Sequence, residues 1–206
     1  MLKVIHIIPN LKKGGAERLV INICKNLKKR PNISVSLVTF SDDNDYKDLT
    51  DEINWEVIPS HFIPSISGKY SKNIKKLQKY IFEFKPNIIH SHLWESEMVC
   101  SQLDYNGAKS FTHFHDNFLQ LKKRIFPLQK KELVNLYERN IIIGSYSRKN
   151  SNFICISANN FSYANNVLPK KFKNSIKLLH NAINLEEFIN TKRGVSSKIK
   201  LINIGS

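Results

Sequence analysis

The chain has 206 residues, 41% of them hydrophobic, which is enough for a sizeable core and too much for an intrinsically disordered protein. Lysine and arginine number 32 against 17 aspartates and glutamates, so the formal net charge is +15. Such a charge favours anionic partners such as nucleotides, phospholipid surfaces or nucleic acids, and it does not choose among them.

The cysteines and the apolar runs bear on the compartment. Cys24, Cys100 and Cys155 each lie in an apolar context, their number is odd, and none forms a C-x-x-C pair. This favours reduced, buried thiols and a cytoplasmic protein. No apolar run is long enough to span a membrane, and "MLKVIHIIP" is too short for the core of a signal peptide. Peripheral contact with the inner face of the cytoplasmic membrane remains open.

Short apolar runs alternate with helical patterns along the chain. Residues 3–8 predict a strand, and 16–29 predict a helix in which Leu19, Ile23 and Leu27 recur every four residues. In chain order we then expect strands at 33–40 and 55–59, a helix at 71–84, a strand at 87–92, a helix near 95–105, a strand at 109–114, a helix around 128–141, a strand at 153–157, a helix at 158–165, and strands at 176–180 and 198–206. This alternation predicts a doubly wound α/β fold, with a mainly parallel sheet and helices on both faces.

The predicted domain boundary lies near the C-terminus. The segment "NTKRGVSS", residues 190–197, is polar and has no apolar period. A lone strand at 198–206 cannot build a domain, so it either joins the main sheet or opens a second unit. We expect residues 1–190 to form one domain, and 191–206 to be a linker and the first strand of another.

Ligands of such sheets bind beyond the carboxyl ends of the strands, so the residues that follow each strand are the most informative. "PNLKKGGAER" follows the first strand, and its Gly14–Gly15 pair precedes a helix whose free N–H groups attract anions. Missing side chains would let an oxygen-rich ligand approach the backbone; a tight turn with nothing bound is the alternative. Neither G-x-G-x-x-G nor a Walker A motif is present.

Histidines follow two of the later strands. In "HSHLWES", His90 is expected in the core, whereas His92 lies at the strand tip. In "HFHDN", His113 and His115 alternate and Asp116 follows. The spacing can place two imidazoles on one face for a metal, but the sequence shows no third ligand. We favour a site that contacts a substrate hydroxyl or moves a proton.

Two further strand ends carry polar candidates. Ser157 is the last residue of "FICIS", where it can cap the next helix, and it is not in a G-x-S-x-G elbow. Asn181 follows "IKLLH" and can bond its own backbone or a ligand.

The order of these motifs resembles the N-terminal, acceptor-side domain of GT-B glycosyltransferases, specifically the retaining family 4. "GGAER" resembles that family's glycine-rich loop, "KPNIIHSH" its "PDIVHxH" strand, "HFHDN" its "T-x-H-D" stretch, and "FICIS" its "vi-x-x-S" segment. "LLHNAINLEEF" resembles the turn that ends the domain, and "KLINIGS" the strand that opens the donor-binding domain. The resemblance covers nearly the whole chain.

The resemblance implies transfer of a sugar from a nucleotide-sugar to an acceptor hydroxyl with retained configuration. The acceptor would be a lipid-linked or growing polysaccharide, as in capsule or O-antigen synthesis. It assigns catalysis to His115 and Asp116, and substrate binding to Gly14, Gly15, Glu17, Arg18, His92, Ser157 and Asn181. It implies no cofactor and no metal. The donor's pyrophosphate would be held by the C-terminal domain, so this chain alone is expected to be inactive.

Three alternatives stay open. The first is a non-catalytic subunit that binds acceptor or membrane and pairs with a separate donor-binding chain. For the glycosyltransferase itself, "LKKRIFPLQKK" (121–131) would suit an anionic lipid surface near a lipid-linked acceptor, or it is an ordinary exposed basic helix and loop. The second is a Rossmann-type nucleotide module, which the missing glycine fingerprint disfavours. Nucleic-acid binding, the third, lacks a recognisable basic and aromatic module.

Overall fold

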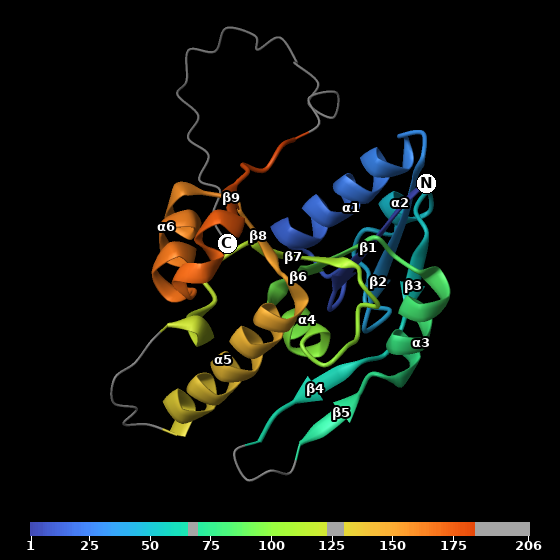
Figure 1. The fold of residues 1–206 in the computed structure, drawn as a ribbon. Coiled ribbons are helices and arrows are strands. Elements are labelled where there is room, and N and C mark those ends of the chain that lie inside the picture. Colours follow the sequence, from blue (N-terminus) through green and yellow to red (C-terminus); the bar gives the residue numbers. More distant parts are fainter. Residues whose placement is uncertain (66–69, 123–129, 184–206) are drawn as a thin grey trace, which may run out of the picture.

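A single parallel sheet forms the centre of the structure (Figure 1). The computed structural model describes residues 1–65, 70–122 and 130–183. In spatial order the strands are β3 (Trp55–Val57), β2 (Ile33–Thr39), β1 (Leu2–Ile8), β6 (Ile88–His92), β7 (Lys109–Phe114), β8 (Asn152–Cys155) and β9 (Ile176–Leu178). Every neighbouring pair is parallel, which confirms the predicted Rossmann-like α/β fold.

Helices cover both faces of the sheet (Figure 1). One face packs against α1 (Gly15–Lys28), and the other against α3 (Lys75–Phe84), α4 (Leu93–Cys100) and α5 (Lys130–Lys149), with α6 (Ala158–Val167) beside β9. The shorter helices are α2 (Lys47–Thr50), η1 (Leu119–Leu121) and η2 (Lys170–Ser175).

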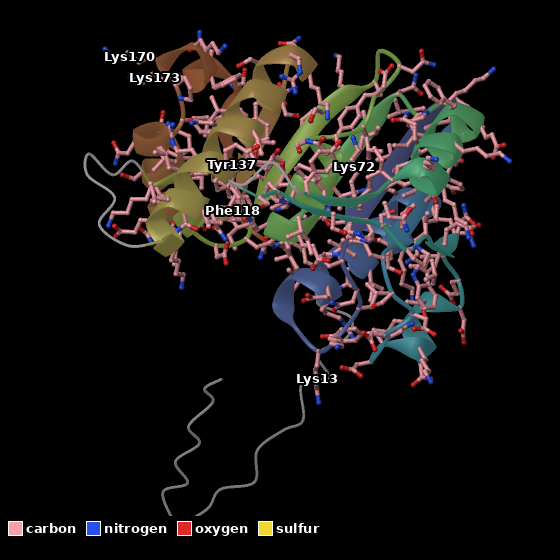
Figure 2. The ribbon with its side chains drawn as sticks, turned by 90° about the horizontal axis from the view of Figure 1, so that it is seen from below. Lys13, Lys72, Phe118, Tyr137, Lys170 and Lys173 are labelled. Atoms are coloured by element: carbon pink, nitrogen blue, oxygen red, sulfur yellow. The ribbon has the colours of Figure 1, made fainter. Side chains whose placement is uncertain are left out.

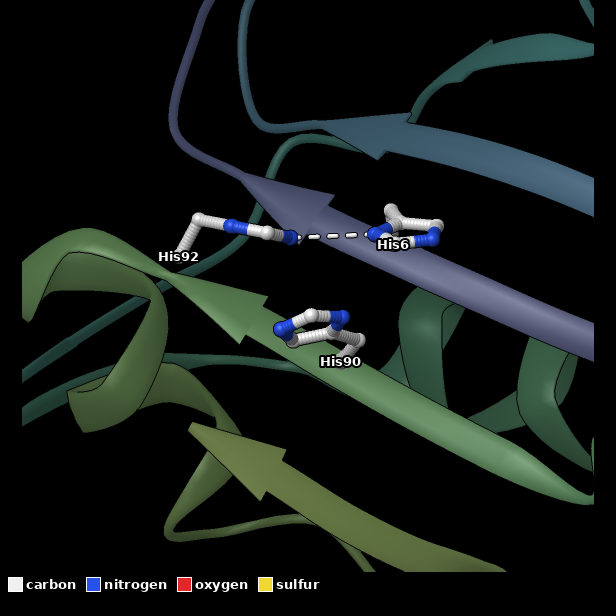
Figure 3. Close-up of side chains that lie close together, drawn as sticks. All are labelled: His6, His90 and His92. Carbon is white, nitrogen blue, oxygen red and sulfur yellow. Dashed lines mark hydrogen bonds between the residues drawn. The ribbon is translucent and has the colours of Figure 1, made fainter. Parts of the chain in front are cut away.

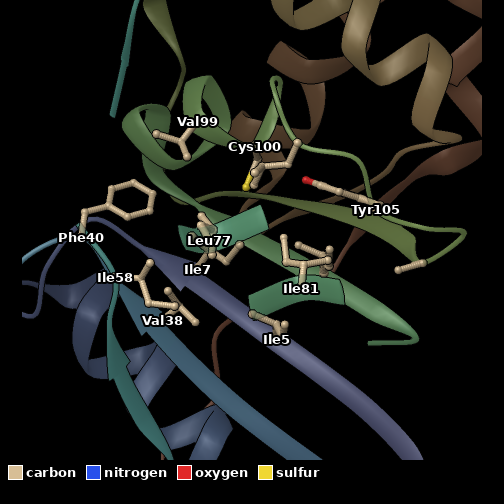
Figure 4. Packing of buried hydrophobic residues seen from close by; sticks show 13 residues of the cluster. Ile5, Ile7, Val38, Phe40, Ile58, Leu77, Ile81, Val99, Cys100 and Tyr105 are labelled. Atoms are coloured by element: carbon tan, nitrogen blue, oxygen red, sulfur yellow. The ribbon is translucent and has the colours of Figure 1, made fainter. Parts of the chain in front are cut away.

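Alternation along β1 explains the two layers. Ile5 and Ile7 point to the face where Leu77 and Ile81 of α3 complete a buried apolar cluster (Figure 4). His6 and Ile8 point to the opposite face, because successive side chains of a strand alternate. Each fully buried aliphatic side chain contributes about 1.5–3 kcal/mol, so the cluster fixes the register of β1.

The helix predicted at 71–84 is too long at its start. Ser71–Asn73 instead form β5, which pairs antiparallel with β4 (His61–Ile63), and α3 begins at Lys75. The backbone groups of Ser71–Asn73 gain partners in this hairpin, which local periodicity could not show. Similarly, α4 ends at Cys100 rather than near 105, and α5 continues to Lys149 rather than ending near 141.

A buried carboxyl links the sheet to two helices. Glu97 of α4 accepts hydrogen bonds from Ser91 Oγ (2.5 Å), Thr112 Oγ1 (3.1 Å) and Tyr146 OH (3.0 Å). These hydroxyls come from β6, β7 and α5. Burial raises the pKa of Glu97 to about 7, and the three hydrogen bonds oppose that rise.

The structure also tests what the composition implied about the cysteines, the lysines and membrane spans. The three cysteines are buried and unpaired, as predicted. Lysines are spread widely: Lys13, Lys72 and Lys170 project from well-separated parts of the chain (Figure 2). Among the described residues, no helix combines the length and apolarity needed to cross a membrane. The predicted boundary at 190/191, the strand at 198–206 and most of the basic segment 121–131 lie outside the described residues.

Candidate active site at the carboxyl end of the sheet

Because the strands are parallel, the segments that follow them emerge at one end of the sheet. The structure thereby brings the candidates to a common end: Gly14 and Gly15 after β1, His92 at the end of β6, His115 and Asp116 after β7, Ser157 after β8 and Asn181 after β9. The sequence predicted this grouping indirectly: it predicted a parallel sheet, and the strands of such a sheet end at one edge.

The loop between β1 and α1 is held by the segment that follows β2. Leu11 forms a parallel bridge with Asn44, and the Lys13 N–H donates to Asp45 Oδ2 at 2.8 Å. The Gly14 N–H donates to the Tyr46 hydroxyl at 3.0 Å, and that hydroxyl donates to the Gly14 carbonyl at 2.9 Å. Tyr46 thus fixes the peptide groups on both sides of Gly14. Sequence reasoning missed this tyrosine, and its position after a predicted strand was the available signal.

The glycine pair begins α1 without a side-chain cap. Gly14 is the N-cap with extended backbone, and α1 starts at Gly15. A Cβ on Gly14 would lie 2.2 Å from Glu17 Oε2, so the Glu17 carboxylate folds back over this turn. A Cβ on Gly15 would meet no atom of the described residues within 4 Å. Neither glycine is needed for a left-handed conformation, so open space, rather than backbone strain, distinguishes Gly15.

Five of the chain's seven histidines gather on the face of the sheet that carries His6. His6 Nδ1 lies 3.0 Å from His92 Nε2 (Figure 3), and His92 Nδ1 lies 3.0 Å from His115 Nε2. In a second pair, His113 Nδ1 lies 3.2 Å from His90 Nε2. This chain of hydrogen bonds ends at His115, and His115 Nδ1 takes no part in it.

Strand register explains why these rings meet. His6 is the register partner of His90, and His92 is that of His113. Partners in adjacent parallel strands point to the same face, and so do residues two apart in one strand. His90 is buried, as predicted for a core histidine, but it belongs to this network. His6 was not predicted as a site residue, because only the pairing of β1 with β6 shows its role.

Burial keeps these imidazoles neutral. It lowers the pKa of His6 and His115 to about 3 and that of His113 to about 4, with a smaller effect of neighbouring histidines on His6 and His115. The pKa values of His90 and His92 are also lowered well below the ordinary range, first by burial and then by neighbouring histidines. At neutral pH His115 can therefore exchange hydrogen bonds with a hydroxyl, but it carries no charge.

The other predicted residues show mixed geometry. Asp116 is exposed, and partial desolvation raises the pKa of its carboxyl. Ser157 caps α6: its hydroxyl accepts from the Asn160 N–H at 3.2 Å and donates to Asn160 Oδ1 at 2.8 Å. Arg18 lies beside the Tyr46 ring, with Cζ 6.0 Å from the ring centroid. Arg18 therefore lies next to Tyr46, the residue that fixes Gly14.

Asn181 lies across from α1. It lines a pocket of about 340 Å³ together with Leu19, Ile23 and His113. The three leucine and isoleucine residues that recur every four along α1 are only partly buried, because the buried stripe of this helix is Val20, Ile21 and Cys24. The predicted periodicity was correct, but part of the apolar face lines this pocket rather than the core.

A strained residue marks the end of β6. Leu93, which follows His92 and begins α4, has φ of 67°. A non-glycine residue in this left-handed region costs about 1–3 kcal/mol, and such residues cluster at functional sites. The turn places His92 at the N-terminus of α4, beside the chain of imidazoles.

Two comparisons agree with this architecture. The model of Glycosyltransferase Family 4 matches residues 13–187. A solved structure of a glycosyltransferase from Rickettsia africae ESF-5 is similar with a TM-score of 0.54 and 19% sequence identity, over 90% of this chain and 44% of that one. This chain therefore spans less than half the length of that neighbour. A search of curated proteins by sequence found no match. On the extent of the family match, the chain belongs to Glycosyltransferase Family 4.

Proposed function

We propose that this chain is the acceptor-side domain of a retaining glycosyltransferase that transfers a sugar from a nucleotide-sugar to an acceptor hydroxyl. The observation that carries the proposal is the convergence of His115 and the glycine-initiated helix α1 at one end of a parallel sheet. His115 supplies a neutral ring that can bond a sugar or acceptor hydroxyl. Asp116 lies next to it and orients neighbouring groups.

The N-terminus of α1 contributes the anion-binding part of the proposed site. The first-turn N–H groups of a helix have no partner within the helix, and its dipole favours negative charge there. The Gly14 N–H is already bonded to Tyr46, so the N–H groups of Gly15 and its successors face the phosphate or acceptor. Glu17 and Arg18 shape this turn, and Ser157 and Asn181 line the remainder of the proposed cleft. His92 is buried and contributes by orienting His115.

The acceptor is proposed to be lipid-linked or a growing surface polysaccharide, processed at the cytoplasmic face of the membrane. The net charge of +15 supports contact with anionic lipid, and the buried free cysteines support a reducing compartment. No cofactor takes part in the proposed transfer. A second, donor-binding domain completes the nucleotide-sugar site, as the length of the Rickettsia africae neighbour supports.

Turnover by the isolated chain tests this division of labour. We expect no sugar transfer when residues 1–206 are incubated with nucleotide-sugars and acceptor glycans, because the groups that hold the donor pyrophosphate belong to the other domain. Radiolabelled sugar transfer and calorimetry with the same nucleotide-sugars provide the measurement. Robust transfer by this chain alone would contradict the need for a donor-binding domain, and tight NAD binding would replace the proposal by a dinucleotide-binding function.

Gly15→Ala separates a ligand loop from a bare turn. The new Cβ meets nothing within 4 Å and the backbone φ is not left-handed. The free energy of unfolding should therefore stay unchanged or rise by up to about 1 kcal/mol. If a ligand approaches the backbone here, the methyl group should weaken its binding about tenfold, a loss of roughly 1.4 kcal/mol.

The measurement pairs urea denaturation of the chain with KM values of the enzyme completed by its donor-binding domain. Gly144→Ala, in the middle of α5, is the matched control, since its Cβ would meet only Arg148 Nη1 at 3.4 Å. Unchanged KM values for both substrates in the Gly15 variant would identify the loop as a bare turn.

A further inference from the structure

The five clustered histidines offer more nitrogen ligands than sugar transfer requires. Two groups of three have one nitrogen from each ring within 4.8 Å of the others: an inner group, His6, His90 and His92, and an outer group, His92, His113 and His115. In the inner group, His90 and His92 lie two apart on β6 and His6 lies on the neighbouring β1. In the outer group, His113 lies on β7, His115 directly follows that strand, and His92 lies on β6. Three imidazoles with a fourth position left open are the ligand set of one kind of catalytic zinc site.

Hydrogen bonds assign the ligand atoms of the outer group. His92 Nε2 is taken by His6 Nδ1, which leaves His92 Nδ1 to face His115 Nε2 at 3.0 Å. His113 Nδ1 is taken by His90 Nε2 at 3.2 Å, and His113 Nε2 is buried without a hydrogen-bond partner among the described residues. A zinc–nitrogen bond of about 2.0–2.1 Å sets tetrahedral ligands about 3.3 Å apart. The separation between His92 and His115 is therefore close to that of two ligands.

His6 and His90 then act as outer partners. Ligating histidines usually bond a second group through the other ring nitrogen, which fixes the tautomer and the ring orientation. His92 has such a partner in His6, and His113 has one in His90.

The outer group is also the accessible one. His115 is partly exposed, whereas His6 and His92 are essentially fully buried. His113 lies in the lining of the 340 Å³ pocket between α1 and residues 179–182. An ion can thus reach the outer group from the side of His115, and the pocket that His113 lines lies beside it.

We propose that His92, His113 and His115 bind one divalent transition-metal ion of the zinc class, with His6 and His90 as outer hydrogen-bond partners. The site shares His92 and His115 with the proposed sugar transfer, and ion binding tests it separately from that activity. A hydrogen-bonded network of neutral imidazoles without metal affinity is the competing description. Within the described residues, that network leaves both His6 Nε2 and His113 Nε2 buried without a partner, whereas an ion at the outer group supplies one to His113.

The test uses the untagged full chain, stripped with EDTA and titrated with Co²⁺ and then Zn²⁺. We expect one Co²⁺ per chain with the visible absorption of a tetrahedral site, displaced by Zn²⁺. Saturating Zn²⁺ should raise the unfolding midpoint by about 5–10 °C. His115→Gln should lower the affinity by more than about 100-fold, and His6→Gln by about 10–100-fold, the usual effect of removing an outer partner.

His115→Gln is the main variant because its partly exposed ring can be replaced without opening the core, and circular dichroism verifies its fold. His61→Gln and His180→Gln, outside the cluster, are the controls and should bind like the wild type. Wild-type protein without saturable binding of one ion would overturn the proposal. So would equal affinity of the His115 variant and the wild type, or loss of binding in either control. Loss in His6→Gln with full binding in His115→Gln would place the ion in the inner group and overturn the assignment.

Discussion

Replacing Glu97 by alanine is expected to lower the free energy of unfolding by about 3–5 kcal/mol. The carboxyl is buried and accepts the hydroxyls of Ser91, Thr112 and Tyr146, from β6, β7 and α5. Its removal leaves these hydroxyls without their acceptor, away from water, and adds a cavity. Urea denaturation followed by tryptophan fluorescence at about pH 6 measures the change.

Glu83→Ala is the matched control. Glu83 is exposed on α3 and pairs with Lys79, four residues earlier, with 3.6 Å between the charged atoms. Loss of such a pair costs about 0.3–0.5 kcal/mol. If Glu97→Ala costs less than twice as much as Glu83→Ala, the three-hydroxyl network does not join the helices to the sheet as described.

The pH dependence of stability provides a second measure of Glu97. Its pKa rises from 4.5 to about 7 on folding, so the folded carboxyl keeps a proton that the unfolded one has lost. The stabilisation is complete below pH 4.5 and is lost as the pH rises through about 7, an amount of about 3 kcal/mol. In the Glu97→Gln variant, residue 97 has no titrating carboxyl, and all the histidines are unchanged.

The difference in unfolding free energy, wild type minus Glu97→Gln, should therefore fall by about 3 kcal/mol from about pH 4 to about pH 8. Because the histidine cluster is present in both proteins, its own pH dependence cancels in this difference. A difference that stays constant over the range would show that the carboxyl titrates normally in the fold.

Substitution of His115 by glutamine is expected to reduce sugar transfer by about 10²–10⁴-fold, the usual contribution of a side chain that exchanges a proton or hydrogen bond in the transition state. The ring ends the chain His6–His92–His115, which fixes its orientation and leaves Nδ1 for a substrate hydroxyl. Glutamine keeps one donor and one acceptor but not the ring geometry. Single-turnover transfer by the enzyme completed with its donor-binding domain measures the effect.

The low pKa of His115 also predicts how sugar transfer depends on pH. Because burial lowers the pKa of His115 to about 3, its titration should cause no loss of wild-type transfer between about pH 8 and about pH 6. His61→Gln, a partly exposed histidine on β4, is the control and should keep wild-type rates. Transfer by the His115 variant within a factor of about three of the wild type would exclude a role in the chemical step.

The pattern of residues was sufficient to predict the sheet and its functional end. Buried strands such as 3–8 are rich in β-branched residues, and amphipathic helices alternate with them, so the sequence predicted a parallel α/β sheet. The positions of Gly14–Gly15, His92 and His115 after strands then placed them at one end. Helix limits were less certain: Ser71–Asn73 fit a helical pattern, but pairing with His61–Ile63 makes them a strand.

By itself, then, the sequence determined the fold class, the family resemblance and the set of polar residues at the strand ends. These depend on local periodicity and on order along the chain. Only the tertiary structure decided which residues meet across strands. His6 joins His92, Tyr46 holds Gly14, and His113 comes to lie beside His90, because strand register and the return of distant loops set these contacts. The physical reason is that side-chain proximity in a parallel sheet depends on pairing between segments far apart in the chain, which no local pattern encodes.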